Sequence, residues 1–323
     1  PKTHHVRRWE HPLRTIPAAA LTAALALAAA SCSAPGSDSG SEDEGTGADR
    51  YLSVGDSLTV GVQPDGEGLP EQTDEAYTDF LTASLAEEGH ELEHQRAGCR
   101  GEDTSTFLEG GNPACGDRYD GGSQVETAED FLEENEGDIE LITLSLGINN
   151  LAGCFEQVDL SDPVDASNLD TDCVEEGLER VEEELPEVTE RLREAAGPDT
   201  QIVGMTYYNP FLAPWAVEHV DDPDPGTPGG ELPDGRGVAD YAVGVMEQLN
   251  DTLRSAYAEQ DIEVADVEAR FDSGEFDVPE ESTTGLPLNV QRVCDWTWMC
   301  DAEIGPDIHT NAEGARELSL IHI

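Results

Sequence analysis

Lysine is almost absent from this sequence, and basic residues of any kind are few. Lys2 is the only lysine, and 16 basic residues stand against 71 acidic ones, which gives a formal net charge of −55. A surface with this excess repels the phosphates of nucleic acids and anionic lipid head groups, so we expect no nucleic-acid partner. The composition favours solubility at high ionic strength, where salt screens the self-repulsion, and suggests a fold that needs salt.

Several motifs are also missing. No Cys-x-x-Cys occurs, and no histidine is spaced to complete a zinc site. The acidic stretches 168–172 and 221–224 lack the ligand spacing of a known calcium loop. We therefore expect neither a metal nor another cofactor. The absence of Gly-x-Ser-x-Gly disfavours an ordinary α/β-hydrolase.

The N-terminus has the pattern of a targeting segment. Basic residues in the first 14 positions precede an apolar stretch at 16–30, which is too short to span a bilayer comfortably. The ending Ala29-Ala30-Ser31-Cys32 resembles a bacterial lipoprotein box. That resemblance implies that residues 1–31 are a signal peptide and that Cys32 is lipidated. The alternative is ordinary secretion, with Cys32 inside the removed peptide.

Residues 32–49 form a predicted flexible acidic linker, rich in Ser, Gly, Asp and Glu. A linker directly after the cysteine suits an enzyme held outside the cell membrane, whose only contact with the membrane is a lipid anchor at Cys32. Without Cys32, six cysteines remain, an even number that fits disulfides in an exported protein. Six cysteines allow 15 connectivities. Proximity in sequence favours the pairs Cys99–Cys115, Cys154–Cys173 and Cys294–Cys300.

Strand-like and helix-like segments alternate along residues 50–317, which we expect to form one domain. Strands are predicted at 51–54, 91–97, 139–146, 201–207 and 262–267. Helices are predicted at 74–88, 125–134, 173–196, 237–259 and from 311, with Pro186 as a kink or boundary and 271–304 irregular. This alternation indicates an α/β fold with a parallel sheet covered on both faces. Residues 318–323 match the translation of a sequencing adapter, so we expect a non-native tail there.

Three stretches fall just after predicted strands and should meet at one edge of the sheet. They are Asp56-Ser57, which we expect to open a helix, Gly101, and Gly147 to Asn149. A serine between a strand end and a helix start is placed to act as a nucleophile beside backbone N–H groups.

Four blocks in order resemble those of the SGNH (GDSL-type) hydrolases. They are Gly55-Asp56-Ser57-Leu58, the glycine of 98–102, Gly147-Ile148-Asn149-Asn150 and the stretch 306–314 around His309. The stretch 294–300 is also similar to that of exported, disulfide-bearing actinobacterial esterases. The resemblance implies a three-layer α/β/α sandwich with a flavodoxin-like parallel sheet.

The resemblance also implies roles for individual residues. Ser57 would be the nucleophile and His309 its base, since a serine hydroxyl is inert near neutral pH without one. The N–H groups of Ser57 and Gly101 and the side-chain amide of Asn149 would form the oxyanion hole. The family's last block usually reads Asp-x-x-His, but here Asp307 lies two residues before His309. Either Asp307 orients the imidazole, or a backbone carbonyl near Pro306 does so and the enzyme works as a dyad.

The predicted function is therefore an exported, monomeric serine esterase or lipase that hydrolyses small-molecule or lipid esters through an acyl-serine intermediate. A catalytically silent binding or surface lipoprotein on the same scaffold and an acyltransferase are the alternatives. Asp56 is predicted to be structural, a turn-former that caps neighbouring N–H groups. His90, His94 and His219 are predicted to be surface or loop residues.

Overall fold

Five short segments form one parallel sheet in the computed structural model, which describes residues 49–116, 118–119, 122–155, 158, 167–213 and 235–322. The predicted signal peptide and nearly all of the linker lie outside these residues. The order across the sheet is β4-β1-β5-β6-β7, and every neighbouring pair is parallel. The strands are β1 (Arg50–Gly55), β4 (Glu93–Arg96), β5 (Ile139–Ser145), β6 (Gln201–Met205) and β7 (Glu263–Ala265).

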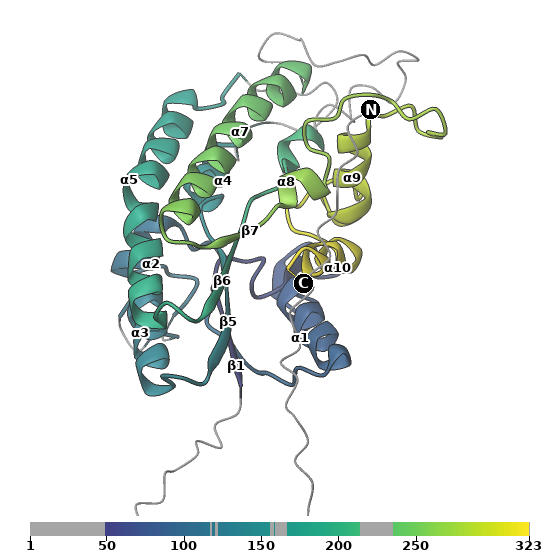
Figure 1. Cartoon of the computed structure of the whole chain (residues 1–323). Coiled ribbons are helices and arrows are strands. Elements are labelled where there is room, and N and C mark those ends of the chain that lie inside the picture. The colour runs from purple at the N-terminus through teal and green to yellow at the C-terminus, as the bar shows by residue number, and fades with distance from the viewer. Residues whose placement is uncertain are drawn as a thin grey trace, which may run out of the picture. The chain divides into compact units, whose positions relative to one another are not determined.

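Helices cover both faces of the sheet, as Figure 1 shows. On one face lie α1 (Tyr77–Glu88), α8 (Val267–Arg270), α9 (Leu288–Trp296) and α10 (Ala312–Leu320), with α10 contacting the other three. On the other face lie α2 (Thr104–Glu109), α3 (Gln124–Glu134), α4 (Asn149–Phe155), α5 (Thr171–Ala196) and α7 (Gly235–Glu259), with α5 contacting the other four. The predicted α/β/α sandwich with a parallel sheet is confirmed.

The sheet is central because its middle strands β1, β5 and β6 are buried along most of their length. In β1, Leu52 and Val54 are fully buried, and the last five residues of β5 are all buried. The long helices α5 and α7 present apolar residues at helical spacing to this sheet and to each other.

The structure differs from the expectations in several elements, and the short helices α2, α4 and α8 were not predicted. Residues 56–61 form a turn rather than the start of a helix, and they lead into the hairpin of β2 (Val62–Pro64) and β3 (Pro70–Gln72). Pro186 lies inside α5 and does not end it. The stretch 271–304, predicted to be irregular, contains α9.

The three predicted disulfides are all formed, between Cys99 and Cys115, Cys154 and Cys173, and Cys294 and Cys300. Each joins residues close in sequence. Residues 318–320, within the expected tail, are the last residues of α10, and Leu318, Ser319 and His322 are buried. None of the helices within the described residues is long and apolar enough to cross a bilayer.

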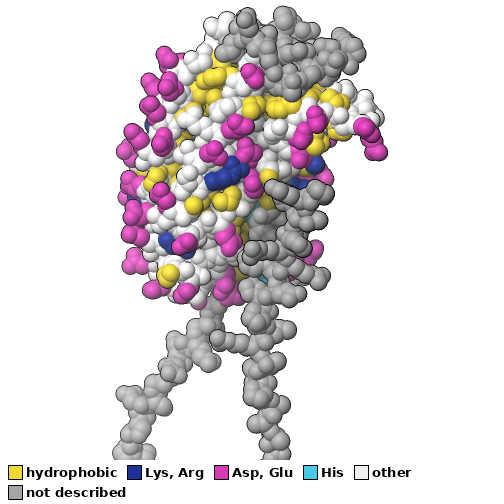
Figure 2. Space-filling view, turned by 45° about the horizontal axis from the view of Figure 1, so that its top comes forward, with side chains coloured by type: hydrophobic (Ala, Val, Ile, Leu, Met, Phe, Trp, Pro, Cys, Tyr) yellow, Lys and Arg dark blue, Asp and Glu magenta, His cyan; other side chains and the backbone are white. Residues whose placement is uncertain are grey.

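Acidic side chains spread over the face of the molecule drawn in Figure 2, and basic side chains occur there at only a few places. The arginines that the structure describes are engaged with acids in several places. Examples are Arg191 with Glu129, and Arg254 with Asp251, Asp266 and Glu268.

Candidate active site

The sheet order places β1 between β4 and β5, so the loops after these three strands are neighbours at one edge. Ser57 follows β1, Gly101 follows β4 and Asn149 follows β5. Gly55 makes this junction possible, because its φ is +123° and a Cβ would collide with the carbonyl of Ser145 on β5. The predicted convergence of the three loops is thus present.

The turn that carries Ser57 is built by the residue before it. Asp56 Oδ1 accepts the N–H of Leu58 at 2.9 Å, and the N–H of Val62 donates to the carbonyl of Ser57 at 3.0 Å. The side-chain bond to the N–H two residues on is an Asx turn, which competes with helix formation. Asp56 is therefore the structural turn-former that was predicted, and no helix N-terminus supports Ser57.

His309 lies in the loop before α10, with its ring held by Asp307. Asp307 Oδ1 lies 2.6 Å from His309 Nδ1 and accepts the backbone N–H of His309 at 2.8 Å. Burial alone would raise the pKa of Asp307, but its contacts with His309 outweigh that effect and lower the pKa below its ordinary value. Of the two expected ways to orient the ring, the geometry is that of Asp307 rather than of a backbone carbonyl.

The backbone around His309 is fixed on both sides. Its carbonyl accepts the N–H of Trp298 at 3.0 Å, and the hydroxyl of Tyr208 donates to the carbonyl of Ile308 at 2.5 Å. Asn311 caps α10 by accepting the N–H groups of Glu313 and Gly314, each at 3.0 Å. The imidazole therefore sits on a well-anchored loop.

Ser57 and His309, far apart in the sequence, line one small pocket. The remaining walls are mostly apolar or aromatic: Leu58, Ile148, Tyr207, Tyr208, Pro210 and Ile308. Ser57 is only 6% exposed, so a reacting group must enter this pocket to reach its hydroxyl. With Nδ1 engaged by Asp307, Nε2 is the nitrogen left to accept a proton from Ser57.

Sequence reasoning missed Tyr207, which lies directly behind the nucleophile turn. Its hydroxyl donates to Asp56 Oδ2 at 2.5 Å, and Ser145 donates to Oδ1 of the same carboxylate at 3.1 Å. Burial of Asp56 raises its pKa to about 6, although these hydrogen bonds act in the opposite direction. The adjacent tyrosines after β6 were the available sign of a buried polar partner.

Of the two other expected oxyanion donors, Gly101 lies in the loop after β4 and Asn149 is the first residue of α4. Gly101 has φ of +74°, a conformation that glycine adopts without strain. One hydrogen of the Asn149 amide goes to the carbonyl of Glu102 at 2.9 Å, which fixes the amide and leaves its second hydrogen for a ligand. Asn150 instead pairs with Thr104 on α2, outside this group of donors.

One histidine differs from its prediction. His94 is on β4, stacked on Tyr51 with ring centroids 4.3 Å apart and hydrogen-bonded to Ser53 at 2.8 Å. Burial lowers its pKa to about 4. Ser53 is fully buried in the sheet, so this second Ser–His pair is not accessible for catalysis. His219 lies outside the described residues.

Within the described residues, Cys99, Glu102 and Cys115 are the one cluster with the composition of a metal site. Both sulfurs are consumed by the disulfide, so they cannot act as thiolate ligands.

Comparison with known proteins bears on the fold and the family of this chain. The extracellular lipase from Streptomyces rimosus aligns at 15% identity and a TM-score of 0.50, covering 84% of this chain and 97% of that one. The phospholipase A1 from Streptomyces albidoflavus aligns at 18% identity and a TM-score of 0.43, covering 74% and 92%. At such identities the likeness concerns the fold alone. No curated protein matches at a significant level. Residues 53–317 match the GDSL-like Lipase/Acylhydrolase family, and the chain therefore belongs to that family.

Proposed function

We propose that this protein is a serine esterase or lipase that hydrolyses carboxylic esters through an acyl-serine intermediate. The observation that carries the proposal is the shared pocket of Ser57 and His309, with the imidazole held by Asp307. Family membership supports hydrolysis as the reaction class. The small, largely apolar pocket suits the acyl part of an ester.

The proposed reaction begins with proton transfer from Ser57 Oγ to His309 Nε2 as Oγ attacks the ester carbonyl carbon. Negative charge moves to the carbonyl oxygen, where the N–H groups of Ser57 and Gly101 and the amide of Asn149 would stabilise it. The tetrahedral intermediate collapses, and the imidazolium gives its proton to the departing alcohol. Water then repeats the same steps on the acyl-serine and releases the acid. Asp307 stabilises the imidazolium in both halves.

Export is part of the proposal. Three disulfides are expected in an oxidising compartment outside the cytoplasm. The apolar N-terminal stretch and the acidic linker support a monomer tethered through a lipid on Cys32 or, alternatively, a secreted protein.

The test compares the wild type with Ser57→Ala and, as a control, Ser105→Ala, which removes a hydroxyl that bonds Glu184 on α5. Ser57→Ala should lower kcat for p-nitrophenyl acetate by at least about 10³-fold, with little change in the thermal midpoint. A fluorophosphonate should label the wild type and Ser105→Ala but not Ser57→Ala.

Three results would contradict the proposal. A folded Ser57→Ala that stays active would remove Ser57 from the mechanism. A wild type that neither turns over nor takes up the fluorophosphonate would favour a catalytically silent binding protein. Preferential transfer of the acyl group to an added alcohol or sugar would favour an acyltransferase.

A further inference from the structure

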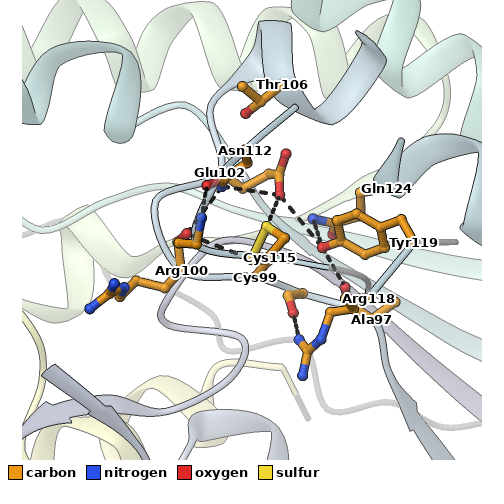
Figure 3. The surroundings of a disulfide bond; sticks show 12 residues. Ala97, Cys99, Arg100, Glu102, Thr106, Asn112, Cys115, Arg118, Tyr119 and Gln124 are labelled. Atoms are coloured by element: carbon orange, nitrogen blue, oxygen red, sulfur yellow. Dashed lines mark hydrogen bonds between the residues drawn. A yellow bond between two sulfur atoms is a disulfide. The ribbon is translucent and has the colours of Figure 1, made fainter. Parts of the chain in front are cut away.

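A partly buried polar cluster lies beside the loop that carries Gly101, and the proposed mechanism does not use it. It consists of Glu102, Asn112, Tyr119, Gln124 and the Cys99–Cys115 disulfide, which we call the Glu102 cluster (Figure 3). Glu102 is completely buried, and its pKa is raised by that burial. Burying a carboxyl group destabilises the fold unless the group has hydrogen-bond partners, so the surroundings of Glu102 matter for stability.

Asn112 fixes the peptide that bears the Gly101 N–H. Its side-chain amide donates to the carbonyl of Arg100 at 3.1 Å. That carbonyl and the Gly101 N–H belong to one peptide group, which is trans. In a planar trans peptide the C=O and N–H point in opposite directions. By holding the carbonyl on its own side, Asn112 directs the Gly101 N–H away from the cluster.

Glu102 contacts the Asn149 amide directly and the Gly101 peptide by way of Asn112. Its backbone carbonyl accepts the amide of Asn149 at 2.9 Å. Its Oε2 lies 3.5 Å from Asn112 Nδ2, 3.5 Å from the Tyr119 hydroxyl and 3.2 Å from Cys115 Sγ. Its Oε1 has no hydrogen-bond partner among the described residues. These contacts are long, so enclosure of the side chain, as much as hydrogen bonding, holds it in place.

The cluster continues to the turn of the nucleophile. Gln124 donates to the Tyr119 hydroxyl at 2.9 Å, and the same side chain pairs with both backbone groups of Gly55. The Gly55 N–H donates to Gln124 Oε1 at 2.5 Å, and Gln124 Nε2 donates to the Gly55 carbonyl at 3.1 Å. Gly55 is two residues before Ser57. A chain of contacts thus runs from the Gly101 loop to the strand end that presents the nucleophile.

We propose that Glu102 and Asn112 are positioning residues that align the Gly101 N–H and the Asn149 amide with the carbonyl oxygen of an ester attacked by Ser57. Neither residue touches the substrate. Asn112 acts through the peptide that bears the Gly101 N–H, and Glu102 acts through the Asn149 side-chain amide and through Asn112. The inference rests on the proposed esterase function. Because the oxyanion forms only as the reaction proceeds, misalignment should lower kcat and leave KM nearly unchanged.

The test uses the purified full chain with Glu102→Ala, Glu102→Gln and Asn112→Ala. Glu129→Ala is the matched control, because Glu129 is on the same helix as Gln124 and loses its ion pair with Arg191 without touching the cluster. Initial rates with p-nitrophenyl acetate give kcat and KM, and thermal unfolding shows whether each variant is folded. The rate of fluorophosphonate inactivation reports how well the proposed oxyanion hole stabilises a charged oxygen.

Glu102→Ala and Asn112→Ala should each lower kcat by about 10- to 100-fold, less than the loss expected for deleting a donor outright. KM should stay within about twofold, and inactivation should slow in parallel with kcat. Glu102→Gln preserves the size of the side chain and should retain kcat within about threefold. Glu129→Ala should keep kcat whatever its thermal midpoint.

Unchanged kcat in folded Glu102→Ala and Asn112→Ala would overturn the inference. So would a loss in Glu129→Ala equal to theirs, because it would trace the effect to general destabilisation. If Glu102→Ala fails to fold, Asn112→Ala decides the question alone. A wild type without turnover or labelling would instead refute the proposed function itself, so the two failures are distinguishable.

Discussion

The pKa values of the carboxyl groups around Ser57 depend on burial and on neighbouring groups more than on the residue type. Three carboxyl groups lie within a few residues of the proposed site: Asp56, Glu102 and Asp307. Burial raises the pKa of Asp56 and Glu102, whereas contact with His309 lowers the pKa of Asp307. Of the three, only Asp307 contacts the imidazole directly, so only it is suited to stabilise an imidazolium.

Asp56 should make the folded state less stable as the pH rises. Its pKa is about 6 in the folded protein and ordinarily 3.8, so between these values the folded state holds a proton that the unfolded state releases. The free energy of unfolding therefore falls with rising pH across this window, by about 2 kcal/mol between pH 4.5 and 7.5 from this group alone. The free energy of unfolding of Asp56→Asn should lack this contribution to the pH dependence, because an amide does not titrate.

Denaturant unfolding of both proteins at several pH values, with the disulfides intact, measures the effect. The difference in unfolding free energy, Asp56→Asn minus wild type, should rise as the pH increases from 4.5 to 7.5. Using the difference cancels the repulsion among surface acids, which changes with pH in both proteins. Parallel pH profiles would show that Asp56 does not titrate in this window.

At the scale of elements, the packing of β6 against α7 depends on Gly204. A Cβ at this position would lie 2.6 Å from two ring carbons of Tyr257, which is fully buried. Gly204→Ala should therefore reduce the free energy of unfolding by about 1–3 kcal/mol through overpacking. In contrast, Gly244 is inside α7, and no described atom lies within 4 Å of its added Cβ.

Gly244→Ala is the matched control, since alanine in a helix interior is favoured over glycine by roughly 0.5–1 kcal/mol. Urea titrations of the two variants should thus move in opposite directions from the wild type. A stable Gly204→Ala would mean that the ring of Tyr257 moves aside at little cost.

The elements that the sequence predicted well are those with a long, regular pattern. The run at 139–146 and the amphipathic stretch 173–196 became β5 and α5, because their periodicity already specifies which residues are buried. The helix expected at Ser57 was wrong, since the Asx turn of Asp56 and the pairing into β2 dominate there. α9 was missed because it is short and surrounded by Pro, Gly and Asp.

The residues of the site also divide into those that the sequence could identify and those that it could not. Motif residues such as Ser57 and His309 could be named from order along the chain, and the structure brings them to one pocket. Tyr207, Gln124 and Glu102 could not be named, because their importance arises from contacts between loops distant in sequence. Nothing in the local pattern around Gln124 and Glu102 distinguishes them from ordinary core or cap residues, and the adjacent tyrosines after β6 were the only sign for Tyr207.

The whole molecule carries a charge that its fold must tolerate. The sequence has a formal net charge of −55, and acidic side chains are spread over the face drawn in Figure 2. Self-repulsion among these charges favours expansion of the chain and opposes the compact state. Salt shortens the Debye length from about 30 Å at 0.01 M to about 10 Å at 0.1 M and 3 Å at 1 M, so repulsion between distant acids should vanish first.

We therefore expect the thermal midpoint to rise steeply between about 0.01 and 0.5 M NaCl at pH 7.5 and then to level off, because most of the screening is complete by then. The same titration at pH 4 should give a smaller rise, since many surface carboxylates are protonated there and less repulsion remains to be screened. Differential scanning calorimetry at both pH values measures both curves.

Equal midpoints at low and high salt would contradict the idea that the acidic surface makes the fold depend on salt. A rise of the same size at pH 4 would trace the stabilisation to the general effect of salt on apolar burial instead.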